Sequence, residues 1–295
     1  MQFKVFKTLW GFSGPPRQAA REAVEAGFDG IEGPAPAAPE TRDGLAAVLE
    51  EHHLDYIAEI CTGGSYVPDR KATPAVHLSD LESKIRIARP LRPRLINVMA
   101  GCDAWPLQVQ YDFFAAAQEL GARHDVVLSF ETHRSRSTFN PWLTEALIER
   151  LPDLRLTADI SHWIVVAERL LDDDSDWQTL LAVAAQVHHV HGRVGYPQGP
   201  QVPHPAAPEY AGCLAFHQRF WEAVWHSQHL RGYGTSTLTP EFGPDGYLHT
   251  LPFTDQPIAD LWQINRWIGD TERAHFQTYT STFRPLAVSQ KGACQ

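Results

Sequence analysis

The chain has 295 residues, of which 43% are hydrophobic, and its 35 acidic and 25 basic side chains give a formal net charge of −10. This composition supports a full hydrophobic core and excludes global disorder, and the acidic balance argues against nucleic acid or an anionic membrane as a partner, because phosphate groups attract Lys and Arg. The four cysteines form no Cys-x-x-Cys pair, the N-terminus lacks the apolar core of a signal peptide, and no apolar run reaches membrane-spanning length, so we expect a cytoplasmic protein.

In chain order, β-type runs alternate with segments of helical composition. The first strand is expected over 3–9, and after a Gly/Pro break it is followed by a helix over 16–26 that Gly27 ends. Further strands are expected over 28–32, 54–60, 94–99, 126–131, 154–158, 187–191 and 237–241. Further helices are expected over 43–52, 75–88, 107–123, 141–149, 177–186, 214–229 and 258–279.

The strict alternation of strand and helix predicts parallel strands joined by crossover helices. Eight such units fit a single (β/α)8 TIM barrel over residues 1–284, with a C-terminal tail over 285–295. The alternative, an open doubly wound sheet, is disfavoured because no Gly-x-Gly-x-x-Gly turn follows the first strand. The Gly/Pro-rich segment 192–212 is longer than an ordinary connection and follows a strand, where barrel enzymes carry substrate loops.

Ionisable side chains stand at the ends of the last four predicted strands, namely Glu131, Asp159, His191 and Glu241. In a barrel these ends lie on one rim, where three carboxylates would repel each other unless a cation lay among them. We therefore predict that the four residues bind one divalent metal ion. Mn²⁺ is favoured, Mg²⁺ and Co²⁺ also suit an oxygen-rich set, and Zn²⁺ accepts His and carboxylate ligands.

Simpler interpretations exist for individual members of this set. Asp159 alone could cap a following helix, and His162 could be a satisfied loop histidine. His188 and His189 compete with His191 as the ligand from the seventh strand. Alternation with a period of two puts His189 and His191 on one face, and His191 is the nearer of the two to the rim.

Several motifs of the chain occur in the same order as in a known family: Gly-Phe-Asp-Gly-Ile-Glu over 27–32, the strand-end Glu131, Asp-x-x-His at Asp159 and His162, His-Val-His over 189–191, and Pro-Glu-Phe-Gly over 240–243. Through them, residues 3–280 resemble the xylose isomerase-like TIM-barrel superfamily of sugar isomerases and epimerases. The resemblance implies a small-molecule sugar substrate and the same four metal ligands. Its branch of DNA-repair endonucleases needs further histidines on the second and third strands, where this chain has Glu32 and Glu59.

The resemblance also implies roles for individual residues. Glu131 and Glu241 would exchange protons with the substrate from opposite faces, and His162 would bind a substrate oxygen. Arg193 is the nearest match to a basic residue that contacts substrate, at a spacing that differs from the ketose epimerases. We therefore expect a divalent-metal-dependent isomerase or epimerase of a sugar or keto-sugar, which abstracts a proton next to a carbonyl via a metal-stabilised enediolate.

Other side chains are candidates for contacting the sugar. Trp10 and Trp105 follow the first and fourth strands and could line a sugar pocket, although plain packing would explain them equally well. His133 lies in the loop after the fifth strand. Arg134 and Arg136 of the same loop could clamp a phosphate or carboxylate, or could be solvated or paired with acids.

Two other functions fit the same pattern. The enediolate could expel a β-substituent, so a metal-dependent lyase or dehydratase acting on a keto-sugar or keto-glycoside would use the same site. A non-catalytic barrel that binds a sugar or a partner protein would not need the opposed carboxylates of Glu131 and Glu241. Formation of a homo-oligomer is compatible with the sequence, which does not identify the sugar.

Overall fold

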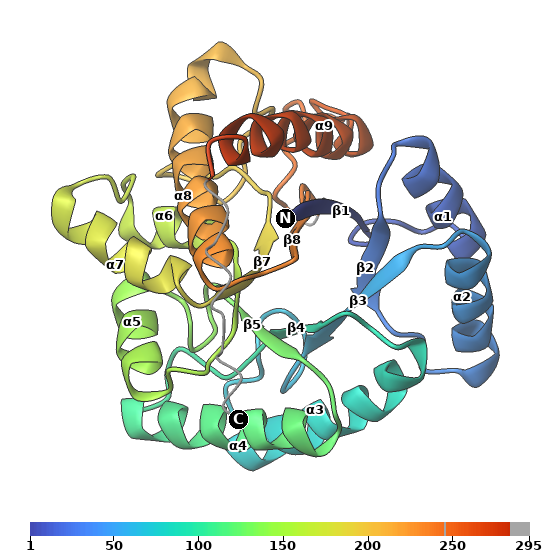
Figure 1. The fold of residues 1–295 in the computed structure, drawn as a ribbon, viewed down its shortest axis with the longest axis vertical. Helices are drawn as coiled ribbons and strands as arrows, with labels where there is room; N and C mark the ends of the chain where they lie inside the picture. Colours follow the sequence, from blue (N-terminus) through green and yellow to red (C-terminus); the bar gives the residue numbers. More distant parts are fainter. Residues whose placement is uncertain (245, 284–295) are drawn as a thin grey trace, which may run out of the picture.

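Eight parallel strands close into a barrel in the order β1 to β8 in the computed structural model, which describes residues 1–244 and 246–283 (Figure 1). The prediction of a single TIM barrel is confirmed. The strands are β1 (Gln2–Thr8), β2 (Gly30–Pro34), β3 (Asp55–Cys61), β4 (Ile96–Met99), β5 (Leu128–Glu131), β6 (Leu156–Ala158), β7 (Val187–His191) and β8 (Thr235–Thr239). The pairing of β1 with β8 closes the sheet. The tail predicted over 285–295 lies outside the described residues.

The helices of the described chain surround the strands (Figure 1). They are α1 (Pro16–Glu25), α2 (Pro39–Glu51), α3 (Pro74–Ala88), α4 (Leu107–Arg123), α5 (Pro141–Arg150), α6 (Ser161–Ala167), α7 (Asp174–Ala184), α8 (Ala211–Leu230) and α9 (Leu261–Thr280), with short 3-10 turns at Arg89–Leu91 and Pro208–Tyr210. A proline opens α1, α2, α3 and α5, where its fixed φ suits the first helical turn and its missing N–H is not needed. Asp173 caps α7 and Asp260 caps α9 through their side chains.

Two predicted boundaries need correction near the site. The strand predicted over 237–241 is β8 (Thr235–Thr239) and ends before Pro240, which has no N–H to donate to the ladder. A further helix, α6 (Ser161–Ala167), follows β6 directly, because an oxygen of Asp159 accepts the backbone N–H of Ser161 at 3.0 Å. Seven residues are too few to show a helical period in the sequence.

The two faces of the strands differ in chemistry. Outward-facing residues such as Val98, Phe130 and Val190 belong to the main apolar core, which also includes residues of the surrounding helices. Phe6, Ile57 and Leu95 form a separate small apolar cluster from alternate positions of β1, β3 and the residue before β4. The polar side chains of the interior are concentrated toward the C-terminal ends of the strands, which leaves that rim available for a binding site.

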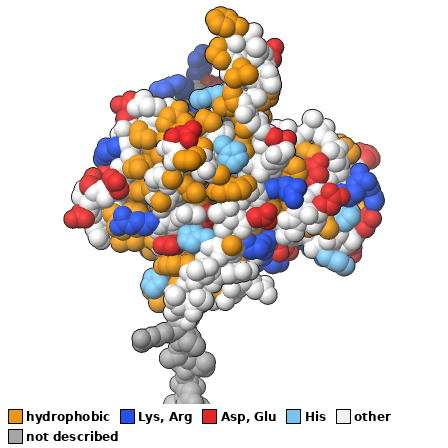
Figure 2. All heavy atoms as spheres, turned by 90° about the horizontal axis from the view of Figure 1, so that it is seen from above, with side chains coloured by type: hydrophobic (Ala, Val, Ile, Leu, Met, Phe, Trp, Pro, Cys, Tyr) orange, Lys and Arg blue, Asp and Glu red, His pale blue; other side chains and the backbone are white. Residues whose placement is uncertain are grey.

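On the face seen in Figure 2, acidic and basic side chains are interspersed among apolar ones. None of the described helices is long and apolar enough to cross a membrane.

Candidate metal centre and adjoining cavity

Four residues predicted as metal ligands lie together at the C-terminal rim. Glu131 ends β5, Asp159 follows β6 by one residue, His191 ends β7, and Glu241 comes two residues after β8. Each offers one nitrogen or oxygen atom such that all four atoms lie within 4.8 Å of one another, and all four residues are buried. The barrel thus brings together side chains that are up to 110 positions apart in the chain.

His191 lies between two carboxylate groups. Its Nδ1 is 3.0 Å from Glu241 Oε2 and 3.8 Å from Glu131 Oε2, while its Nε2 is 3.1 Å from Glu32 Oε1. Burial alone would lower the pKa of His191, but the surrounding carboxylates of Glu241, Glu32 and Glu131 raise it well above its ordinary value. A carboxylate behind a histidine fixes the orientation and tautomer of the ring in metal sites.

Glu32 is the centre of a buried network beneath the rim. Its Oε2 is 3.0 Å from His189 Nε2 and accepts the hydroxyl of Thr239, and His189 Nδ1 is 2.8 Å from the hydroxyl of Thr237. Burial would raise the pKa of Glu32, but His191 and His189 hold it well below its ordinary value. His188 faces the other way, against Tyr233, so the predicted alternation along β7 is confirmed.

Glu131 and Asp159 each have a fixed hydrogen-bond partner. Asn97 donates to Glu131 Oε2 over 2.7 Å. Burial raises the pKa of Glu131 to about 8, with His191 opposing the shift and the neighbouring Glu241 adding to it. One oxygen of Asp159 accepts a hydrogen bond from the N–H of Ser161, and the other accepts one from the guanidinium of Arg193. Asp159 therefore both holds the start of α6 through Ser161 and belongs to the four-residue cluster.

Arg193 bonds to three neighbouring side chains through Nη2 and Nε. Its Nη2 donates to Asp159 and, over 2.7 Å, to His162 Nε2, and its Nε donates to Ser161 Oγ over 3.2 Å. Its guanidinium carbon is 5.4 Å from the ring centroid of Trp10 and 4.8 Å from that of Tyr247, distances at which a cation interacts with an aromatic face. Arg193 thus offsets the charge of Asp159 and joins it to the wall of the cavity.

His162 and His133 lie together near Arg193, with ring centroids 4.0 Å apart and ring planes inclined at 53°. Burial lowers the pKa of both rings well below the ordinary value, and the positive charge of Arg193 adds to this effect. Both imidazoles are therefore neutral at pH 7. His162 Nδ1 has no hydrogen-bond partner in the part of the chain that the structure describes, whereas His162 Nε2 accepts from Arg193.

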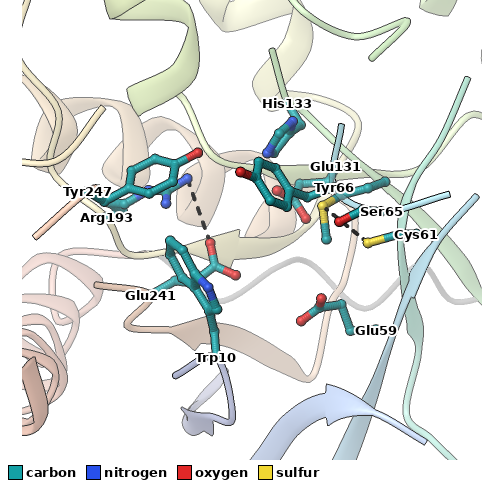
Figure 3. A pocket seen from close by; sticks show the side chains of 11 residues that line it. Trp10, Glu59, Cys61, Ser65, Tyr66, Glu131, His133, Arg193, Glu241 and Tyr247 are labelled. Atoms are coloured by element: carbon teal, nitrogen blue, oxygen red, sulfur yellow. Dashed lines mark hydrogen bonds and ion pairs between the residues drawn. The ribbon is translucent and has the colours of Figure 1, made fainter. Parts of the chain in front are cut away.

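A cavity of about 200 Å³ opens beside the cluster (Figure 3). It is lined by Trp10, Glu59, Cys61, Ser65, Tyr66, Met99, Glu131, His133, Arg193, Glu241 and Tyr247. Two carboxyl groups of the cluster, those of Glu131 and Glu241, therefore face both the cluster and the cavity. Asp159 and His191 lie behind this surface and are almost completely inaccessible to solvent.

The structure brings most of the predicted substrate contacts to this cavity. Trp10, His133 and Arg193 line it, and His162 is buried directly behind Arg193. Trp10 rests against Gly243, where an added Cβ would lie 2.0 Å from the indole, so the residue must be glycine for the ring to hold this position.

Two candidates from the sequence lie elsewhere. Trp105 is not part of the cavity wall; its ring packs against His77 and Phe113 at centroid distances of 4.7 and 5.3 Å, as the packing alternative expects. Arg136 is completely buried and donates to the backbone carbonyls of residues 62, 65, 66 and 101. An anion clamp built on Arg136 is therefore ruled out, because its guanidinium instead holds the loop that follows β3.

Several residues of the site were missed by sequence reasoning. Glu59 and Cys61 come from β3, and Tyr66 and Tyr247 come from loops after β3 and β8. Glu32 and Glu59 were noted only as residues that differ from the endonuclease pattern. The alternation of side chains along β3 puts Glu59 on the same inward face as Ile57 and could have predicted its position. No such signal exists for the loop residues, because their side chains follow no period.

The chemistry of the cluster fits a divalent cation. Three carboxylates and one imidazole are buried within 4.8 Å of each other, and His191 Nδ1 points among them without hydrogen-bond geometry to any described partner. A cation in this position would relieve the repulsion among the carboxylates and accept the nitrogen lone pair.

Fold and site together define the class: a parallel eight-stranded TIM barrel whose C-terminal rim holds a buried group of side chains able to bind a metal ion. The chain belongs to the xylose isomerase-like TIM barrel family, whose model matches residues 20–204. Comparison with curated proteins gives no match.

Solved structures share the fold over almost the whole chain. An L-ribulose 3-epimerase has a TM-score of 0.63 at 16% identity, the probable 3-DHS dehydratase AsbF from Bacillus anthracis 0.59 at 14%, and the IOLI protein with a binding zinc atom 0.61 at 11%. In each case 97% of this chain and 100% of the other are covered. At such low identity the likeness concerns the fold.

Proposed function

We propose that this protein is a divalent-metal-dependent isomerase or epimerase of a sugar or keto-sugar. The observation that carries the proposal is the convergence of Glu131, Asp159, His191 and Glu241 within 4.8 Å on the floor of a cavity. These four residues would hold the ion, with Mn²⁺ favoured by the oxygen-rich set and Mg²⁺, Co²⁺ or Zn²⁺ as alternatives. The ion would supply positive charge that stabilises the charge developing on a substrate oxygen.

Glu131 and Glu241 would carry the proton transfer. Both face the cavity, Glu131 from the end of β5 and Glu241 from the segment after β8 (Figure 3). One carboxylate would remove the proton from the carbon next to the carbonyl, and the other would return a proton to a neighbouring atom or to the opposite face of the same carbon. A carboxyl group must be ionised to act as a base. Burial raises the pKa of Glu131, and a bound cation would lower it again, so that Glu131 could be ionised in the metal-loaded protein.

The remaining contacts orient the substrate and exclude water. The ring of Trp10 offers an apolar face on which a sugar can lie. His133 and Arg193 line the same cavity and can bond to sugar hydroxyl groups, and His162 would support Arg193 or reach a substrate oxygen through its vacant Nδ1. A closed environment of this kind strengthens every electrostatic interaction in the reaction.

The proposal is tested by metal content and by hydrogen exchange. Elemental analysis by plasma mass spectrometry is expected to find about one divalent ion per chain in the purified protein. In D₂O it is expected to introduce deuterium next to the carbonyl of a ketose or 3-keto sugar, and a chelator should abolish this exchange. Glu241→Gln should lower the exchange rate by about 10²–10⁴-fold, while Glu119→Gln, on the exposed side of α4, should leave it unchanged. Metal-free protein with unchanged activity would refute the proposal.

A metal-dependent lyase or dehydratase is the second candidate. It is favoured by the presence of two carboxyl groups on different walls of one cavity, since one can remove a proton while the other protonates a departing hydroxyl or alkoxy group. Release of water or of an aglycone from a 3-keto sugar would distinguish this reaction from epimerisation, which conserves the substrate's composition.

A further inference from the structure

A third carboxyl group lines the cavity without belonging to the candidate metal centre. Glu59 lies on β3, paired in register with Asn97 of β4, and its side chain points into the cavity (Figure 3). It is absent from each group of described residues whose atoms are close enough to share an ion. No hydrogen bond or ion pair to Glu59 occurs within residues 1–244 and 246–283, so the structural role of a salt bridge does not account for this carboxyl.

The surroundings of Glu59 favour its neutral form. Burial raises the pKa of Glu59 to about 8, and the carboxylates of Glu241, Glu131 and Glu32 add to the shift, while His191 opposes it. A neutral carboxyl group offers one O–H donor and one carbonyl acceptor. That pair matches the donor and acceptor of a sugar hydroxyl, whereas an ionised carboxylate would only accept.

The described wall of the cavity offers no unpaired positive charge to an anionic substrate, and Arg134 lies outside this wall, with its guanidinium carbon 5.2 Å from the ring centroid of Tyr247. Arg193 is the only Lys or Arg on the wall formed by the described residues, and its guanidinium already bonds to Asp159, His162 and Ser161. Arg136 is fully used by backbone carbonyls. A divalent ion together with Arg193 would just balance the three carboxylates of the candidate centre. A phosphate or carboxylate group would therefore lose its hydration without gaining an unpaired counter-ion from the described wall.

We propose that Glu59 is a substrate-binding residue that bonds to a sugar hydroxyl group from the β3 wall, in a pocket that accepts uncharged sugars and rejects phosphorylated or carboxylated ones. This inference rests on the proposed function and defines its substrate class. Trp10, Tyr66 and Tyr247 complete the wall with aromatic rings, which suit the apolar faces of a neutral sugar.

Titration calorimetry on the metal-loaded protein tests this assignment. The probes are three neutral sugars (D-fructose, L-ribulose and methyl 3-keto-glucoside) and two phosphorylated ones (D-fructose 6-phosphate and D-ribulose 5-phosphate). Wild type is expected to bind at least one neutral probe, and to bind each phosphorylated probe at least tenfold more weakly than that one. Glu59→Ala should weaken binding of the neutral probe at least tenfold. Glu59→Gln, which keeps a donor and an acceptor, should stay within threefold of wild type.

Controls separate this inference from the proposed function. Glu50→Gln, exposed on α2, should bind as wild type does, and circular dichroism should show that every variant is folded. The inference is overturned if Glu59→Ala binds the neutral probe as tightly as wild type, if a phosphorylated probe binds more tightly than every neutral one, or if no neutral probe binds. Protein that contains metal and exchanges deuterium but gives one of these results would retain the proposed function and lose only the role of Glu59.

Discussion

Neighbouring residues on the same strands of this barrel are buried for different reasons. On β5, Phe130 faces outward and is 1% exposed, while Glu131 faces inward and is 2% exposed. The first packs edge to face on Phe114 of α4 at a centroid distance of 4.9 Å, and the second accepts a hydrogen bond from Asn97. The two side chains are therefore equally buried, but burial of Phe130 stabilises the fold, whereas burial of Glu131 holds a polar group in a fixed position.

The same contrast runs along the barrel axis inside the sheet. Phe6, Ile57 and Leu95 form an apolar cluster, whereas Glu32, His189 and His191 form a polar one nearer the C-terminal ends of the strands. Buried charge is expensive unless it is paired and hydrogen-bonded. The proposed function uses this polar end of the interior, while the outer face and the apolar cluster stabilise the fold.

The largest expected effect is a loss of activity without a loss of stability when Glu131 of the inner face is replaced. Glu131→Gln should lower deuterium exchange into a bound sugar by about 10²–10⁴-fold, because the amide cannot accept the proton. Unfolding in urea should change little, since a neutral amide resembles the neutral acid that burial favours at this position. If the variant exchanges deuterium at the wild-type rate, Glu131 does not transfer the proton. If the variant is much less stable than wild type, Glu131 stabilises the fold as Phe130 does.

The matching substitution on the outer face should do the opposite. Phe130→Ala deletes an aromatic ring from the core between β5 and α4 and should lower the free energy of unfolding by about 3–5 kcal/mol. At a temperature where the variant is folded, its metal content should equal that of wild type. Phe130→Leu, which keeps most of the apolar volume, serves as the control and should lose distinctly less stability in the same urea titration.

A smaller effect is expected from the carboxylate behind His191. Glu32→Gln keeps the size of the side chain but removes the charge that orients His191 Nε2 at 3.1 Å, so metal affinity should fall by about 10–100-fold. Competition with a chelator of known affinity measures it. Thr237→Val is the matched control, because Thr237 contacts His189 and not His191. Equal losses in both variants would mean that the network stabilises the barrel and does not tune the candidate metal centre.

Much of this arrangement could be predicted because it is local in the sequence. β-type runs predicted the strands, and an ionisable residue at the end of a run predicted the positions of Glu131 and His191 at the rim. Glu241 was predicted at the end of a strand; it lies two residues beyond β8 and still meets the other three residues at the rim.

The partners of these residues could not be predicted in the same way. Glu32 and His189 are 157 positions apart and meet only across the closed barrel. Tyr66 and Tyr247 enter the cavity from loops, where no period relates a side chain to a face. Trp10 and Trp105 each follow a strand, and nothing in their sequence surroundings distinguishes the one that lines the cavity from the one that packs.

The smallest expected effect comes from replacing these two tryptophans, one on the cavity wall and one in the core. Trp10→Leu removes an aromatic ring from the cavity wall, where it also lies 5.4 Å from the guanidinium of Arg193, and it should raise KM for the sugar by about 3–10-fold, since such contacts contribute about 1 kcal/mol. Trp105→Leu should leave KM unchanged and lower the free energy of unfolding, because its ring packs on His77 and Phe113. Steady-state kinetics and urea unfolding on both variants measure the two effects. If Trp105→Leu changes KM while Trp10→Leu does not, the sugar lies nearer to α4 than to the cavity beside Glu131.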